Sequence, residues 1–374
     1  MPNATSRERA GQHLIGGFPG TAPPPPLLER IAAGRLGGVI LFKRNIESAG
    51  QLLELTHALQ RAAAGAPLGL PLLVAIDQEG GRVSRLSGDF TLLPPARNLG
   101  RLGDAALARE AARAVGRELR AAGVNLNFAP VLDLLTNPGC AVIGDRAFGD
   151  DPETVSALGA AFIAGLQEAG VAACAKHFPG IGSMAPDPHE TLPSSPLGLD
   201  DLRGRELIPF RRAFAPGADA ASAMAAHALF PRIDAERPAS LSPRFLRDLL
   251  RGEMGYGGLI VTDDLEMGAI PDPVAAAWES LLAGADLALI CHNEEMQERA
   301  WGRIEEGLRR EEIAPEAQRS SLRRIEAAKA RYAPPARDFV RPGDLARRHR
   351  EREAVVGCAA HRAVREKVTQ ITFG

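Results

Sequence analysis

The chain has 374 residues, of which 45% are hydrophobic, so it can bury a large core divided among one to three domains. Lysine and arginine number 44 against 46 acidic residues, and the net charge of −2 argues against a nucleic-acid or polyanion partner. The amino terminus has no apolar segment typical of a signal peptide, and no run of about 18 apolar residues is present to span a membrane.

Eight apolar runs recur along the chain, with stretches of helical spacing between them. Continuous apolar runs, unlike alternating ones, are typical of strands that are buried on both faces. The runs cover residues 13–18, 37–42, 72–77, 125–131, 171–178, 221–228, 258–264 and 286–292. The intervening amphipathic stretches, several of which end at a glycine, cover residues 27–36, 48–63, 104–123, 152–170, 201–214, 243–255 and 274–285.

This alternation of strands and helices predicts a single (β/α)8 barrel of the TIM type within residues 1–332. A doubly wound sheet is the alternative, and it would carry a glycine-rich phosphate-binding turn after its first strand. The segment GGFPG (16–20) does not match GxGxxG, and the sequence contains no GxxxxGK[ST] motif. The barrel is therefore the preferred fold.

Residues after the eighth run are expected to form a helical extension. Helical spacing continues over 294–310 and again near 315–331, and the proline-rich stretch 333–342 interrupts it. Residues 333–374 are interpreted as a linker and an Arg-rich, partly helical tail that packs on the barrel or trails from it. We assign no chemistry to this tail.

Polar side chains stand at the carboxyl ends of the apolar runs, where barrels of this kind form their sites. A strand end inside a core would bury such charges only at considerable cost, so their recurrence is the main evidence for a site. Lys176 and His177 are either hydrogen-bond donors to a ligand or a buried, satisfied pair. The full set comprises Asp77, Arg146, Lys176, His177, His227, Asp263, Asp264 and His292.

Several members of this set keep more than one interpretation. Asp263 follows GLIVT and is a nucleophile, a metal ligand or a helix N-cap, although Asp264 is the better cap because LEMGAI follows it. Arg82 and Arg85 are either substrate clamps or ordinary salt-bridge partners. The lone histidines at 227 and 292 either pack in the core or contact a ligand.

The loop KHFPGIGSMAPDPHETLP (176–193) places Asp187 and His189 on either side of Pro188. Proline favours an extended conformation for the residue before it, and residues i and i+2 of an extended segment point to the same side. The carboxylate is then placed to orient the imidazole for proton transfer near neutral pH. The alternative is a surface loop with unrelated polar residues.

No metal or cofactor is expected. His189-Glu190 does not begin an HExxH zinc motif because residue 193 is proline, and the histidines are scattered. The four cysteines show no CxxC pair, and three of them lie in apolar stretches as buried thiols of a reducing compartment do. The cysteines therefore favour a cytoplasmic protein, and we also expect it to be a monomer.

Five motifs in order resemble family 3 glycoside hydrolases, and more narrowly the single-domain bacterial β-N-acetylhexosaminidase branch. The resemblance covers roughly residues 10–330 and is specific because all five occur together. The motifs are IDQEGGRVSRL (76–86), NLNFAPVLDLLTNP (125–138), GDRAFGDDP (144–152), KHFPG with a downstream D-x-H, and GLIVTDDLEMGAI (258–270).

The resemblance implies a barrel fold, retaining glycoside hydrolysis and a carbohydrate substrate. Asp263 would be the nucleophile, and His189, paired with Asp187, the general acid/base. Retaining glycosidases need these two groups about 5–5.5 Å apart, and a loop that swings can assemble them when sugar binds. The positions that match the family's contacts to the sugar in the −1 subsite are Asp77, Arg146, Lys176 and His177, with Arg85 as a further contact.

Two residues depart from the family pattern. Ile181 stands where KHFPGHG has its second histidine, and Pro188 stands where the family usually has serine. Pro188 is expected to stiffen the loop and lower turnover. Neither departure removes a residue with a named catalytic role, so we expect an active enzyme.

The expected activity is that of an exo-acting β-N-acetylglucosaminidase, and the family suggests cell-wall muropeptides in cytoplasmic recycling as its substrates. Three alternatives stay open. A phosphorylase would use the neutral imidazole because it does not repel phosphate as a carboxylate would. A two-domain β-glucosidase would take its acid/base from a second domain that this sequence does not contain. A sugar-binding protein without catalysis would be explained by the two departures.

Overall fold

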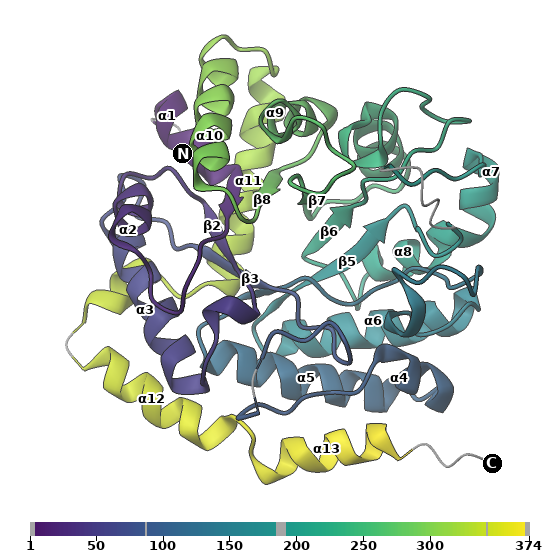
Figure 1. Ribbon diagram of the computed structural model, residues 1–374, viewed down its shortest axis with the longest axis horizontal. Coiled ribbons are helices and arrows are strands. Elements are labelled where there is room, and N and C mark those ends of the chain that lie inside the picture. Colours follow the sequence, from purple (N-terminus) through teal and green to yellow (C-terminus); the bar gives the residue numbers. More distant parts are fainter. Residues whose placement is uncertain (1–3, 87, 185–191, 342, 371–374) are drawn as a thin grey trace.

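The protein is described by a computed structural model that covers residues 4–86, 88–184, 192–341 and 343–370 (Figure 1). Eight parallel strands follow one another in sequence order and close into a barrel, because β1 pairs with both β2 and β8. Each strand lies within one of the predicted apolar runs, and the predicted (β/α)8 barrel is confirmed. The strands are β1 (Leu14–Gly16), β2 (Gly38–Leu41), β3 (Leu73–Ile76), β4 (Leu126–Asn127), β5 (Ala172–Phe178), β6 (Ser222–Ala225), β7 (Leu259–Asp264) and β8 (Leu287–Ile290).

The barrel strands are apolar throughout because both of their faces are buried. Alternate residues point to opposite sides of a strand. Leu73 and Ala75 accordingly belong to the cluster that fills the barrel, whereas Val74 and Ile76 pack with the surrounding helices. The inner cluster also includes Tyr332 from the helix α11 (Pro315–Tyr332), which closes the amino-terminal end of the barrel. The opposite end, where the strands finish, is left for a site.

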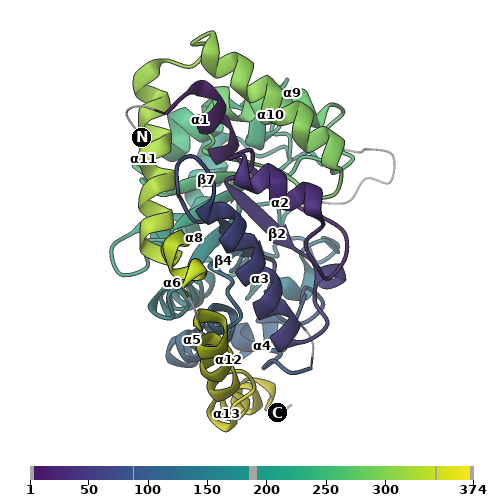
Figure 2. The same ribbon diagram turned by 90° about the vertical axis from the view of Figure 1, so that its left-hand side faces the viewer.

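Helices surround the barrel, as Figures 1 and 2 show. Two of them, α1 and α4, were not predicted. The predicted helix 201–214 contains a π-helical turn, η3, and the predicted helix 243–255 is the π-helix η5. The remaining predicted helices are confirmed within a few residues. The helices of the barrel layer are α1 (Ser6–Gln12), α2 (Pro25–Ala32), α3 (Ala49–Ala64), α4 (Ala96–Leu102), α5 (Ala105–Ala121), α6 (Pro152–Glu168), α7 (Leu199–Asp201), η3 (Leu202–Glu206), α8 (Leu207–Phe214), η5 (Arg244–Glu253), α9 (Pro273–Ala283), α10 (Glu294–Arg309) and α11 (Pro315–Tyr332).

Side-chain caps explain where several of these helices begin. Asp104 accepts a hydrogen bond from the backbone of Leu107 at the start of α5, and Asp151 accepts one from Thr154 at the start of α6. Gly284 ends α9 with φ of +118°, a conformation that glycine adopts at little cost. The starts of α5 and α6 and the end of α9 are thus marked by residue types in the sequence.

The carboxyl-terminal extension packs on the helical layer. It comprises the 3₁₀ turn η6 (Ala336–Val340), α12 (Asp344–Val355) and α13 (Ala359–Thr369). Both ribbon views show α12 and α13 running along α3, α5 and α4 (Figures 1 and 2). Val364 and Val368 of α13 are buried in the main hydrophobic core.

The described residues bear on two expectations, one about membrane-spanning helices and one about the cysteines. Within them, no helix combines the length and the apolar character needed to cross a membrane. Cys140, Cys174 and Cys291 are buried free thiols, and Cys358 is partly exposed.

Candidate active site

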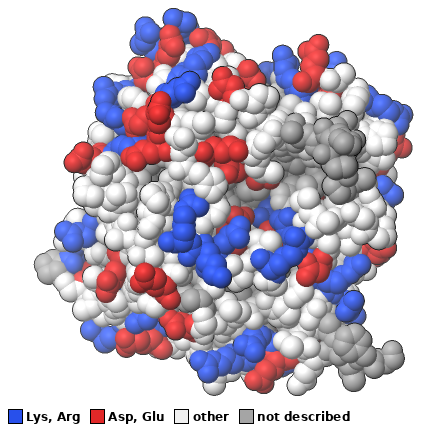
Figure 3. Space-filling view, viewed as in Figure 1, with Lys and Arg blue, Asp and Glu red and all other residues white. Residues whose placement is uncertain are grey.

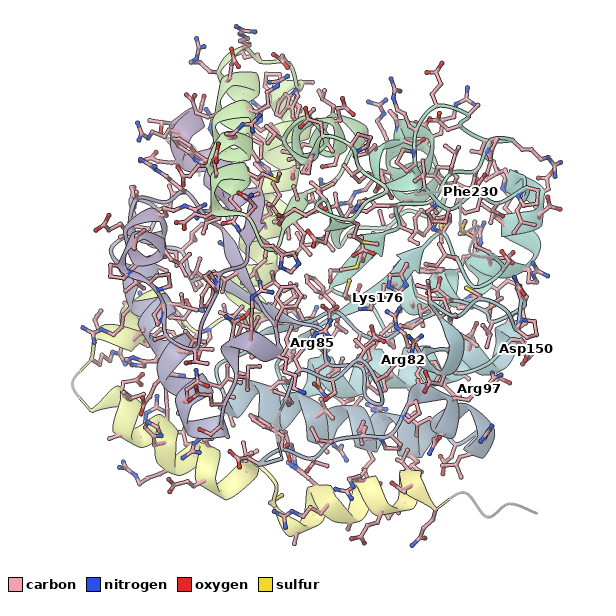
Figure 4. All side chains as sticks on the ribbon, in the orientation of Figure 1. Arg82, Arg85, Arg97, Asp150, Lys176 and Phe230 are labelled. Carbon is pink, nitrogen blue, oxygen red and sulfur yellow. The ribbon has the colours of Figure 1, made fainter. Side chains whose placement is uncertain are left out.

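A hollow lies near the middle of the face seen in Figure 1, with acidic and basic side chains within and around it (Figure 3). Figure 4 places Lys176, Arg85 and Arg82 close to this position. These residues come from the end of β5 and from the loop after β3, so the hollow is at the carboxyl ends of the strands. The sequence predicted a site at this end of the barrel.

Lys176 lies at the centre of a network of buried charges. Its Nζ is 2.9 Å from Oδ1 of Asp77 and 2.7 Å from Oε1 of Glu79. Arg146, from the 3₁₀ turn η2 (Gly144–Arg146), donates from Nε and Nη2 to the two oxygens of Glu79, each at 2.8 Å. Signs alternate along the network, so each buried charge has an opposite partner.

These partners keep the network ionised. Burial raises the pKa of Glu79, but the charges of Lys176 and Arg146 outweigh it and lower the pKa to about 2. Burial lowers the pKa of Lys176, yet the carboxylates of Asp77 and Glu79 leave it above its ordinary value. The pocket therefore presents fixed ionic groups at neutral pH, which form strong hydrogen bonds with neutral polar ligands.

His177 is held in one orientation by Asp133, whose side chain is fully buried. The Nδ1 atom of His177 lies 2.7 Å from Oδ2 of Asp133, whose Oδ1 accepts the backbone N–H of Ile181 at 2.7 Å. Because a carboxylate only accepts, Nδ1 carries the proton in this bond. The Nε2 atom of the neutral ring is then an acceptor, and it lies 3.3 Å from Nη2 of Arg146.

Asp263 is a part-buried carboxylate at the end of β7. The backbone N–H of Asp264 donates to its Oδ1 at 2.8 Å. Burial raises the pKa of Asp263, but the neighbouring side chains of His177, His227 and Lys176, with the N–H of Asp264, leave the pKa below its usual value. Asp263 is therefore an ionised carboxylate beside Lys176 and His177.

The expectation that Asp264 caps a helix is wrong. Its Oδ1 accepts the backbone N–H groups of Glu266, at 3.1 Å, and Cys291, at 3.2 Å. Residues 265–270 form turns instead of a helix, because this segment bridges to the end of β8. The next helix, α9, begins later, where Asp272 is the N-cap and accepts the backbone N–H groups at 274 and 275.

The two lone histidines have different surroundings. His227 is buried, with Nδ1 2.7 Å from the Ser240 hydroxyl and Nε2 3.0 Å from the carbonyl oxygen of Asp264. His292 is half exposed, and its Nδ1 lies 3.0 Å from Nη1 of Arg44. His227 therefore supports the end of β7 through its bond to the backbone of Asp264, whereas His292 lies at the exposed edge of the mouth.

The two arginines of the loop after β3 also differ. Arg82 donates to Oδ1 of Asp145 at 3.0 Å and to the carbonyl oxygens of residues 141–143, so it is a salt-bridge partner that fixes a loop. Arg85 lies over the ring of Phe42, and its Nη2 is 3.6 Å from Oδ2 of Asp77. Arg85 thus stands beside the buried network with part of its guanidinium exposed.

Sequence reasoning did not single out Glu79 or Asp133, although both lie within motifs that it quoted. The signal for Asp133 was a single acidic residue inside the largely apolar stretch 128–135. The signal for Glu79 was indirect. Lys176 and Arg146 at the mouth need more than one carboxylate as partners, and Asp77 alone could not supply both. Asp187 and His189, the predicted acid/base pair, lie outside the described residues.

A closed barrel whose strand ends gather a buried ionic network and an ionised carboxylate is typical of a (β/α)8-barrel enzyme. In the part of the chain that the structure describes, no group of three or more His, Cys, Asp or Glu side chains is arranged to hold a metal ion. The sequence profile described as the glycosyl hydrolase family 3 N-terminal domain matches residues 22–327, and the chain belongs to this family.

Individual relatives agree with this assignment. A β-hexosaminidase of Stenotrophomonas maltophilia (strain K279a) is 41% identical over 275 residues, which cover 70% of this chain and 78% of the relative. The structure of NagZ from Neisseria gonorrhoeae in complex with N-trifluoroacetyl-D-glucosamine superimposes with a TM-score of 0.77 at 30% identity, covering 95% of this chain and 96% of that one.

A longer relative shows the same barrel within a larger protein. A fungal multi-domain family 3 β-N-acetylglucosaminidase superimposes with a TM-score of 0.89 at 37% identity. The match covers 97% of this chain, which spans only 42% of the fungal chain.

Proposed function

We propose that this chain is a retaining, exo-acting β-N-acetylglucosaminidase that removes terminal non-reducing GlcNAc from its substrates. The observation that carries the proposal is Asp263, an ionised carboxylate at the end of β7 beside the buried side chains of Lys176 and His177. A retaining glycosidase needs such a carboxylate as its nucleophile. The names of the relatives, β-hexosaminidase and β-N-acetylglucosaminidase, support the choice of sugar.

In the proposed reaction, a carboxylate oxygen of Asp263 attacks the anomeric carbon and the glycosidic bond breaks. His189, oriented by Asp187, gives its proton to the leaving oxygen, and the sugar becomes esterified to Asp263. The neutral His189 then takes a proton from water, which attacks the same carbon and releases GlcNAc and the free carboxylate. The roles of Asp187 and His189 rest on the family resemblance.

The fixed charges at the mouth are proposed to bind the sugar hydroxyls. Carboxylates accept hydrogen bonds from hydroxyl groups, whereas ammonium and guanidinium groups donate to them, so a network of both signs suits a polyhydroxylated ring. We assign this role to Asp77, Lys176, Arg146, His177 and Arg85. Cell-wall muropeptides in cytoplasmic recycling are proposed as substrates from the family resemblance.

The proposal is tested by p-nitrophenol release from the β-N-acetylglucosaminide and the β-glucoside. We expect the wild type to hydrolyse the first substrate only, Asp263→Asn to be inactive, and His189→Ala to lose roughly 10²–10⁴-fold in rate. The matched control is Asp145→Asn. Asp145 is an exposed residue that pairs with Arg82, and this substitution removes its carboxylate charge. No turnover of either substrate by the wild type, with or without phosphate, would favour a sugar-binding protein instead.

A further inference from the structure

The carboxyl-terminal extension and the loop after β3 meet at one buried carboxylate. Glu118 of α5 is 1% exposed and accepts the backbone N–H and the hydroxyl of Thr91, each at 2.7 Å. It also accepts the backbone N–H of Gly357 at 3.0 Å and Nδ1 of His361 at 2.8 Å. Two donors therefore come from the loop and two from the extension, and Glu118 joins them.

The extension also packs directly on the backbone of this loop. Gly357 has φ of +61°, and a Cβ at this position would lie 2.4 Å from the carbonyl oxygen of Asp89. Only glycine permits both this conformation and this close approach. The contact between the extension and the loop is therefore specific to the residue at 357.

Within the loop, the part near Thr91 is bonded to the part that carries the site residues. The backbone N–H of Gly81 donates to the carbonyl oxygen of Leu93 at 2.9 Å, two residues beyond Thr91. A Cβ on Gly81 would lie 2.7 Å from the side chain of Pro95, so the two parts of the loop are in tight contact. Gly81 is two residues from Glu79, the partner of Lys176. A shift of residues 91–95 would therefore displace the buried network.

The extension is anchored well enough to act as a support. Val368 is fully buried in the main core, and its carbonyl oxygen accepts a hydrogen bond from the side chain of Asn98 at 3.4 Å. At the other end of the extension, Asp344 of α12 is buried and its Oδ2 lies 3.5 Å from Nε2 of His57 on α3. Anchors at both ends hold Gly357 and His361 in place between them.

We propose that residues 343–369 are a brace that positions the described parts of the loop after β3, residues 77–86 and 88–95, for sugar binding. His361 and Gly357 are its positioning residues, acting through Glu118 and Thr91 on the part of the loop that carries Asp77 and Arg85. The inference rests on the proposed function, because it is there that Asp77 and Arg85 are assigned to the sugar. Loss of the brace weakens binding in the ground state and the transition state alike, so KM rises while kcat is kept.

The test uses the full chain with His361→Ala, its conservative counterpart His361→Asn, and Ile304→Ala as a control. Ile304 is fully buried in α10, so Ile304→Ala leaves a cavity in the main core away from the extension and from Glu118. All are assayed on the p-nitrophenyl β-N-acetylglucosaminide at a temperature where each is fully folded, and amide hydrogen exchange is followed at residues 80–86. If His361→Ala does not fold, Thr91→Val removes the hydroxyl bond from the loop side instead.

We expect His361→Ala to raise KM about 5-fold with kcat within about twofold, and to speed exchange at residues 80–86. His361→Asn, whose amide N–H replaces Nδ1–H as donor, restores both readouts, and Ile304→Ala changes neither. The proposal is overturned if His361→Ala alters neither readout, or if Ile304→Ala alters them equally. An inactive wild type would reject the proposed function, whereas the exchange measurement would still decide on the brace.

Discussion

The charges at the mouth of the barrel alternate in sign, from the part-buried Asp77 through the buried Lys176 and Glu79 to the part-buried Arg146. Removing one buried partner leaves another charge unpaired, which costs about 3–5 kcal/mol. The same groups are proposed to bind sugar, so stability and binding depend on the same side chains. Single substitutions in this network should therefore affect both.

The pH dependence of stability should report on Glu79. Its pKa is about 2 in the folded protein against an ordinary value of 4.5, so the folded state favours the ionised form. This contribution, about 3 kcal/mol, is present above pH 4.5 and is lost as the pH falls from 4.5 towards 2, because the unfolded chain takes up the proton first. Urea unfolding at several pH values measures it.

Two variants identify the residue responsible for this pH dependence. Glu79→Gln should flatten the pH dependence between 4.5 and 2, because the titrating group is absent. Glu316 is fully exposed, and its hydrogen bonds with Arg323 and Arg319 also lower its pKa to about 2. Solvent screens such surface pairs, so Glu316→Gln should leave the curve unchanged. An unchanged curve in Glu79→Gln would contradict the assignment.

Asp133→Asn should reduce activity without dismantling the site. The amide oxygen can still accept one backbone N–H, but the amide N–H₂ would then face Nδ1–H of His177. The ring must rotate or change tautomer, so Nε2 no longer faces Arg146 as an acceptor. We expect kcat/KM to fall roughly 10²-fold, with a smaller change in Tm. Asp145→Asn is the control, and equal activity in both variants would show that the orientation of His177 is unimportant.

At the scale of elements, the apolar runs predicted all eight strands because strands buried on both faces have few alternatives to apolar residues. Strand ends predicted much of the site for the related reason that charges there need a function or a partner. Glu79 was missed because its partners, Lys176 and Arg146, are remote in sequence. The error at Asp264 arose because an acidic residue before LEMGAI resembles an N-cap. Its carboxylate instead accepts the N–H of Glu266 in a local turn and the N–H of Cys291 just after β8.

Ile181, the departure from the family in the loop after β5, has a structural role in this chain. Its side chain packs against a small apolar cluster formed by Val131, Cys140, Ile143 and Ala147. This cluster supports the segment that leads to Arg146. The isoleucine thus fits apolar surroundings, and the residue that the family usually has would not.

Restoring the histidine should therefore be harmful. Ile181→His would place an imidazole against an apolar cluster at a part-buried position, and we expect it to lower the free energy of unfolding by about 2 kcal/mol without raising kcat. Ile181→Val, which removes one methylene group, should cost about 1 kcal/mol and serves as the control. Chemical denaturation and the p-nitrophenol assay measure both effects. A rise in kcat in Ile181→His would show that the missing histidine has a catalytic role.

At the scale of the whole molecule, the two ends of the barrel differ: one carries the candidate site, and the other carries a charged cluster that holds helices to the barrel. Asp286, at the start of β8 and fully buried, accepts hydrogen bonds from the backbone of Ile260 at 2.9 Å and from the hydroxyl of Ser321 at 2.6 Å. It also pairs with Arg251 and Arg324, so it ties η5 and α11 to the barrel. This cluster lies at the end opposite the mouth, where conserving the fold is the main requirement.

Asp286→Asn should therefore separate stability from sugar binding. It leaves two part-buried guanidinium groups without the buried anion that pairs with them, and we expect the free energy of unfolding to fall by about 3 kcal/mol. KM should change by less than about twofold at temperatures where the variant is folded, because the site at the other end of the barrel keeps its geometry. Glu79→Gln, a buried carboxylate of the mouth with two cationic partners, is the matched comparison and should impair both stability and KM. If Asp286→Asn raises KM as much as Glu79→Gln does, the two ends are coupled through the barrel, and the ionic network of the mouth then depends on how α11 closes the other end.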